Sequence, residues 1–115
     1  MMWKDQLMAE LAMAEESLRA GNAGRARTCA RRAVGLAVTE WQRRDPRVSY
    51  GADFLRQLQG IAAGETIPKT VRTAAMRLQA KLGTDFQSSS MDPVEDAMIV
   101  IRYLLDQMGE SPKVS

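Results

Sequence analysis

Apolar residues recur at steps of three and four along most of this 115-residue chain, the spacing that places side chains on one face of a helix. The first such segment covers residues 3–20. Its apolar face consists of Trp3, Leu7, Leu11, Ala14 and Leu18. Gly21 suits the position after a helix end and Asn22 suits the N-cap of a following helix. So short a connection predicts that the first two helices are antiparallel neighbours.

The second predicted helix covers residues 23–44. Its inward stripe consists of Ala26, Ala30, Ala33, Ala37 and finally Trp41. Four alanines in succession indicate that a neighbouring helix approaches closely, because their side chains hold the two backbones little apart. Asp45 and Pro46 end the helix, since proline disfavours helical geometry in the residue before it.

Three further helices complete the predicted fold. A shorter one follows Ser49 and stops at Gly64, and a fourth starts at Pro68 and closes at Gly83. After a polar stretch, Asp92 and Pro93 provide an N-cap and first position for a helix that runs to about Met108. We therefore expect an all-α protein, a four-helix up-and-down bundle with one additional short helix. Residues 1–115 form a single domain in this interpretation, with 109–115 as a flexible tail.

Composition excludes several kinds of chemistry. The chain has no histidine and one cysteine, Cys29, so histidine-dependent catalysis and the usual zinc ligand sets are absent. The acidic pairs at 15–16 and 95–96 are adjacent along a helix and point about 100° apart, so neither pair shares a face. We expect these acids to be solvated or capping, and Cys29 to be a buried small hydrophobe. The sequence thus predicts no catalytic residue, no metal and no cofactor.

Charge is distributed unevenly along the chain. Residues 19–47 hold eight arginines and two acids, a local charge of +6, whereas the remainder carries −4. Arg25, Arg32 and Arg43 align within about 20° on the second helix and form an outward ridge, which Arg27 and Arg31 flank on the other side. This arginine ridge predicts binding of an acidic ligand, either nucleic acid, a nucleotide phosphate or an acidic protein. The alternative is ion pairing with the acidic first helix, together with an ordinary contribution of the arginines to solubility.

A glycine-containing loop at residues 21–25 precedes the second helix. It could bind an anion at the helix N-terminus. It lacks the preceding strand and the Gly-Lys-Ser/Thr ending of a phosphate-binding loop. We therefore interpret it as a cap between two packed helices.

The last predicted helix is apolar nearly all round. One face is formed by Val94, Ala97, Met98, Ile101, Leu105 and Met108. Ile99, Val100 and Tyr103 lie on roughly the opposite side, which predicts burial on two sides. Either this helix is central in the bundle or the second face binds another protein. The second interpretation makes Ile99, Val100 and Tyr103 the partner-binding residues of a homo-oligomer or of a complex with another protein.

Two blocks of the sequence resemble the HEPN domain, a helical-bundle family. One block is the opening hairpin, residues 14–21, with the alanine-spaced helix after it. The other comprises residues 67–82, a polar loop and the start of the last helix at 92–97. The resemblance implies a binding subunit, often dimeric, that in some cases acts beside a small nucleotidyltransferase. Catalytic members are ribonucleases with an arginine followed by a histidine. Arg102 has no histidine after it, so that activity is not implied here. The first hairpin also resembles, more weakly, a tetratricopeptide unit.

No apolar run near the N-terminus resembles a signal peptide, and no stretch approaches the roughly 20 apolar residues of a membrane span. The expected protein is therefore cytoplasmic, not bound to a membrane and not an enzyme. Our first hypothesis is a binding protein that self-associates or docks a partner through its last helix. The alternative is a module that binds nucleic acid or a nucleotide through the arginine ridge.

Overall fold

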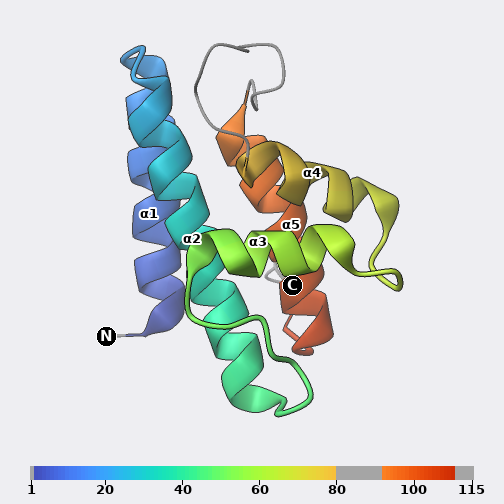
Figure 1. The fold of residues 1–115 in the computed structure, drawn as a ribbon. Coiled ribbons are helices and arrows are strands. Elements are labelled where there is room, and N and C mark those ends of the chain that lie inside the picture. The colour runs from blue at the N-terminus through green and yellow to red at the C-terminus, as the bar shows by residue number, and fades with distance from the viewer. Residues whose placement is uncertain (1, 80–91, 111–115) are drawn as a thin grey trace.

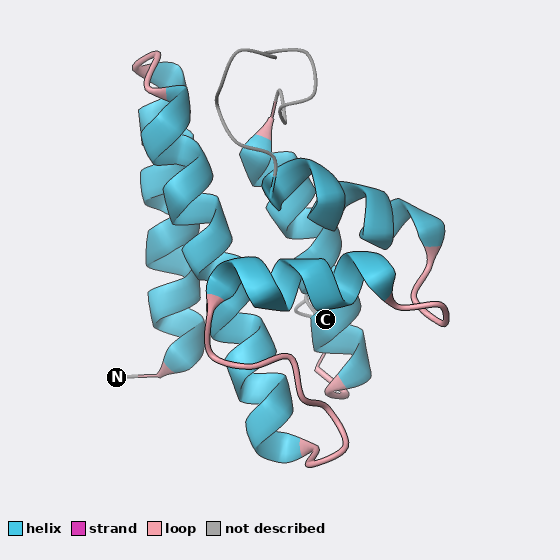
Figure 2. Cartoon of the chain, in the orientation of Figure 1, coloured by secondary structure: helices cyan, strands magenta, loops and turns pink. Residues whose placement is uncertain are grey.

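The computed structural model describes residues 2–79 and 92–110, and five helices occupy most of this part of the chain (Figure 1). They are α1 (Trp3–Arg19), α2 (Ala23–Arg44), α3 (Phe54–Ala63), α4 (Lys69–Gln79) and α5 (Pro93–Gln107). Figure 2 shows helices and loops without a strand over the described residues. The prediction of an all-α protein is confirmed.

Helices α1 and α2 form the long hairpin that the sequence predicts (Figure 1). Gly21 reverses the chain with a φ of +81°, a conformation that glycine adopts without a steric penalty. Asn22 then caps α2, because its side-chain oxygen accepts a hydrogen bond from the Arg25 backbone N–H at 3.0 Å. The alanine stripe of α2 is fully buried, as are Leu7, Leu11 and Ala14 of α1.

Helix α3 starts later than the sequence predicts, at Phe54, with Asp53 as its N-cap. Residues 45–53 form a loop instead, which the side chain of Gln42 holds in place. The Gln42 amide nitrogen donates to the Gly51 carbonyl at 2.9 Å, and its oxygen accepts from the backbone N–H groups of Tyr50 and Gly51. These bonds satisfy backbone groups that a longer helix would otherwise have paired.

Helix α3 lies across α2 rather than along it (Figure 1). The crossing depends on Gly35 of α2, because a Cβ at this position would lie 2.2 Å from a ring carbon of Phe54. Leu58 and Ile61 of α3 are fully buried beneath the crossing. The two helices can therefore approach closely only where α2 lacks a side chain.

Helix α5 packs against both α2 and α4, and its inward residues join the single core cluster. Asp92 caps it by accepting from the Glu95 backbone N–H at 3.0 Å, as the capping pattern predicts. The predicted end of the fourth helix, Leu82 and Gly83, lies outside the described residues. The up-and-down order of a four-helix bundle stays a prediction.

The chain after α5 is partly held by ion pairs. Glu110, which falls in the predicted flexible tail, accepts from Arg44 at 2.6 Å and also pairs with Lys4. These contacts join the start of α1 and the end of α2 to Glu110, which follows α5. Both lower the pKa of the Glu110 carboxyl, with hydrogen bonding from Lys4 as the larger cause.

Candidate functional site: the arginine ridge and the hairpin end

The arginine ridge of Arg25, Arg32 and Arg43 is exposed along α2, as the sequence predicts. Its three members differ in their partners. Arg43 forms two hydrogen bonds to Glu40, at 3.1 and 2.5 Å. Arg25 and Arg32 have no ion pair with any described residue. The ion pairs to acids of α1 that would offer an alternative role for the ridge are therefore absent from the described part of the chain.

Glu40 is a buried acid that neutralises the C-terminal end of the ridge. Hydrogen bonds from Arg43 and then Arg44 lower its pKa to about 2, well below that of an ordinary glutamate. Glu40 is thus ionised at neutral pH, and its single negative charge is shared by these two guanidinium groups, while Glu110 provides a second acidic partner for Arg44. The uncompensated positive charge of the ridge is concentrated on its N-terminal half, at Arg25 and Arg32.

Arg27 and Arg31 do not belong to this surface, and the prediction that they flank the ridge is wrong. Arg27 is only 3% exposed, and Arg31 is half-buried with its Nε donating to the Leu78 carbonyl at 2.6 Å. Burial lowers the pKa of both guanidinium groups, and the nearby Arg27 lowers that of Arg31 further. Both lie about a third of a turn around α2 from the alanine stripe, and the bond from Arg31 to Leu78 joins this side of α2 to α4.

The three partner-binding residues predicted on α5 have different surroundings. Val100 is 0% exposed and lies in the core, so it is not available to a partner in this fold. Ile99 and Tyr103 are half-buried at the edge of the core. Tyr103 packs edge-on against Trp41, with ring centres 6.4 Å apart. Much of the second apolar face of α5 is therefore covered by the chain itself.

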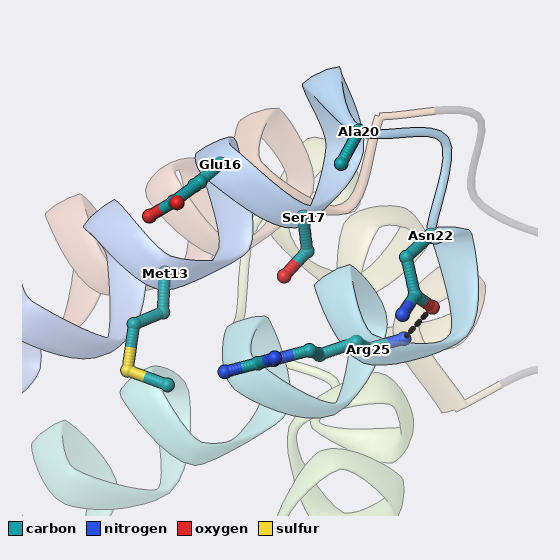
Figure 3. Close-up of a pocket in the computed structure, with 6 residues that line it drawn as sticks. All are labelled: Met13, Glu16, Ser17, Ala20, Asn22 and Arg25. Atoms are coloured by element: carbon teal, nitrogen blue, oxygen red, sulfur yellow. Dashed lines mark hydrogen bonds between the residues drawn. The ribbon is translucent and has the colours of Figure 1, made fainter.

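A hollow of about 160 Å³ lies where α1 and α2 meet at the end of the hairpin (Figure 3). It is lined by Met13, Glu16, Ser17, Ala20, Asn22 and Arg25. Arg25 therefore belongs to both the ridge and the hollow. The Ser17 side chain is directed toward the Arg25 side chain from the opposite helix (Figure 3). Sequence periodicity suggested a cap at this turn but gave no sign of a hollow beside it.

An aromatic cluster at the other end of α2 was not predicted as a unit. Trp41 lies 6.0 Å from Tyr50 and contacts Tyr103, while the guanidinium of Arg44 lies 5.9 Å from the Trp3 ring centre. Burial raises the pKa of both tyrosines. Trp3, Trp41 and Tyr103 each lie on an apolar face that the sequence predicts, but the sequence did not show that these faces meet. The cluster joins four segments and is structural in character.

One acid differs from the prediction that the acidic pairs at 15–16 and 95–96 are solvated or capping. Asp96 is buried rather than solvated, and Arg77 of α4 holds it with contacts of 2.6 to 3.1 Å. The predicted burial of Cys29 is confirmed. No group of three or more potential metal ligands occurs among residues 2–79 and 92–110. Within the same residues, no helix has the length and apolar character needed to cross a membrane.

No protein-family model matches this chain, and searches of curated proteins and of solved structures give no match either. The HEPN resemblance therefore stays a prediction.

Proposed function

We propose that this chain is a non-catalytic binding protein whose arginine ridge contacts the phosphate backbone of a nucleic acid. The supporting observation is that Arg25 and Arg32 are exposed on one line of α2 and form no ion pair with any described residue. Guanidinium groups bind phosphate oxygens in a planar, two-pronged geometry. Two such groups without an acidic partner among residues 2–79 and 92–110 are available to an external anion.

The dimensions of the ridge suit a strand of nucleic acid. Arg25 and Arg43 are separated by 18 positions, which is about 27 Å along a helix. This length covers several successive phosphates of a nucleic-acid strand. No aromatic residue interleaves with the ridge to stack bases, so we expect binding that does not depend on base sequence.

Fluorescence anisotropy with a labelled single-stranded RNA, measured over a range of salt concentrations, tests this proposal. We expect Arg32→Glu to weaken binding and to reduce the salt slope by about one or more counterions. Arg43→Glu should have a smaller effect, because Glu40 already offsets the Arg43 charge. Arg102→Glu, an exposed arginine on α5, is the matched control. Absence of binding, or equal loss in Arg32→Glu and Arg102→Glu, would refute the proposal.

Docking of a protein through α5 is the second candidate function. It is supported by Ile99 and Tyr103, which lie four residues apart on the helix and keep part of their surface exposed. Self-association or a partner, such as a nucleotidyltransferase if the chain is HEPN-like, would cover this edge. From the sequence we also propose that the helices form an up-and-down bundle and that the protein is cytoplasmic.

Light scattering coupled to size exclusion tests self-association through this edge. Ile99→Asp should yield folded protein of lower mass. Tyr103→Lys should do the same, but it also removes the Trp41 contact, so Ile99 is the cleaner position. Arg102→Glu again serves as the control. Unchanged mass with intact helicity in Ile99→Asp would rule out this edge as a self-association surface.

A further inference from the structure

Helix α3 begins beside the arginine ridge (Figure 1). Gly35, on which the Phe54 ring packs, follows Arg32 by three residues and lies about 60° around α2 from it. Thr39 follows Gly35 by one turn and is exposed. Its hydroxyl accepts a hydrogen bond from the side-chain amide of Gln57 in α3 at 3.4 Å. The first turns of α3 therefore form one border of the ridge, directly after Arg32.

Phe54 brings an aromatic ring to this border, although the line of the ridge on α2 carries none. Its Cδ1 and Cε1 atoms are the ones nearest to a Cβ built on Gly35, so the ring meets α2 with one edge. The residue is 38% exposed, which leaves ring surface open to solvent. A single exposed phenylalanine is common on protein surfaces and indicates nothing by itself. Here the ring adjoins Arg32, which has no acidic partner among the described residues.

The spacing of these groups suits one nucleotide. Residues three or four apart on a helix have Cβ atoms about 5–6 Å apart, which applies to Arg32 and Gly35 and also to Arg32 and Leu36. Leu36 is half-buried on the ridge, so the surface next to the Arg32 guanidinium is apolar. A nucleotide whose phosphate is bound to Arg32 can therefore turn its base toward the Phe54 ring.

An aromatic ring beside a row of cations favours a single strand. Proteins that bind single strands combine positive charge along the backbone with aromatic side chains on which bases stack. In a duplex the bases are paired and stacked on one another, so their faces are closed to a protein ring. Phosphate contacts alone favour the duplex, because it carries the higher density of negative charge.

We propose that the ridge binds single-stranded nucleic acid in preference to a duplex, with Arg32 on a phosphate and a base stacked on the Phe54 ring. This inference rests on the function proposed above and specifies the form of nucleic acid that is bound. Stacking on an aromatic ring accepts every base, so binding stays independent of base sequence.

Fluorescence anisotropy at constant salt tests the preference with three labelled probes. They are a mixed-sequence RNA strand, the same strand annealed to its complement, and an abasic strand of equal length. The intact strand should bind about tenfold more tightly than either of the others, the effect of one base stack. The abasic strand keeps every phosphate, so it isolates the contribution of the bases. A duplex or an abasic strand that binds as tightly as the intact strand overturns the inference.

Substitutions in the first turn of α3 assign the preference to the ring. Phe54→Leu keeps an apolar side chain on Gly35 but removes the aromatic face. It should weaken single-strand binding about tenfold and leave both the salt slope and duplex binding unchanged, because no phosphate contact is lost. Phe54→Tyr should bind like the wild type. The matched control is Leu55→Ala, since Leu55 is the next residue and is 37% exposed.

The readouts separate loss of stacking from loss of structure. Circular dichroism verifies that each variant is folded. Equal losses for strand and duplex in Phe54→Leu contradict a stacking role, as does an equal loss of single-strand binding in Leu55→Ala. If strand and duplex bind equally and the salt slope falls in Arg32→Glu, phosphate binding by the ridge stands and the inference about Phe54 fails. If none of the probes binds, the proposed function fails as well.

Discussion

The close approach of α3 to α2 makes Gly35→Ala an informative substitution. Gly35 is buried inside α2, and a Cβ there would lie 2.2 and 2.3 Å from two ring carbons of Phe54. It would also lie 3.2 Å from the side-chain oxygen of Gln57, which is itself buried. The Phe54 ring is 38% exposed, so it can relieve the clash by turning toward solvent. The substitution therefore reduces the burial of the Phe54 ring, which destabilises the fold, and introduces a residue with a higher helix propensity, which stabilises it.

Two opposing effects determine the result. Alanine favours a helix interior over glycine by about 1 kcal/mol. Displacing a ring that is buried over somewhat more than half its surface, and straining its neighbours, costs about 2 kcal/mol. We expect Gly35→Ala to destabilise the protein by about 1 kcal/mol in the free energy of unfolding. In a Phe54→Ala background the clash is absent, and the same substitution should stabilise by about 1 kcal/mol.

Urea unfolding followed by far-ultraviolet circular dichroism measures all four proteins of this double-mutant cycle. The expected coupling between the two positions is about 2 kcal/mol, with unchanged m-values. If Gly35→Ala stabilises both backgrounds equally, Phe54 does not pack on Gly35, and the crossing of α2 and α3 has a different basis.

Three further predictions concern packing and charge. Gly60→Ala places a Cβ 2.2 Å from the Tyr50 ring and should lower the free energy of urea unfolding by about 1 kcal/mol. In a Tyr50→Ala background the same substitution should cause no such loss. Additive losses from the two substitutions would contradict the contact. Arg77→Met should lower the free energy of unfolding by about 2 kcal/mol, because it leaves the buried Asp96 carboxylate without its guanidinium. Asp96→Asn should lower it by about 1 kcal/mol, because the Arg77 side chain is exposed enough to be hydrated. Equal losses in the two variants would argue against this difference. The Glu40 pKa of about 2 lies below its ordinary value of 4.5, so ionised Glu40 stabilises the fold above about pH 4.5 and this contribution is lost as the pH falls to about 2. The urea midpoint should therefore fall more steeply over this window in the wild type than in Glu40→Gln.

Helix positions were predictable because the signals for them are local. The bounds of α2 and the caps at Asn22 and Asp92 follow from residue types within one turn of each other. The start of α3 was not predictable, because it depends on the side chain of Gln42, which pairs with loop backbone eight or nine residues later. A contact of that kind leaves no periodic pattern.

The sequence predicted which side of α2 carries the exposed arginines, but it did not predict which of their charges are paired. Helical periodicity correctly placed Arg25, Arg32 and Arg43 on the exposed side of α2. It could not show that Glu40 pairs with Arg43, that Arg27 is buried or that Arg31 bonds to α4, because these depend on how the elements pack around α2. The hollow was hidden for the same reason, since Glu16 and Arg25 become neighbours only through the fold of the hairpin.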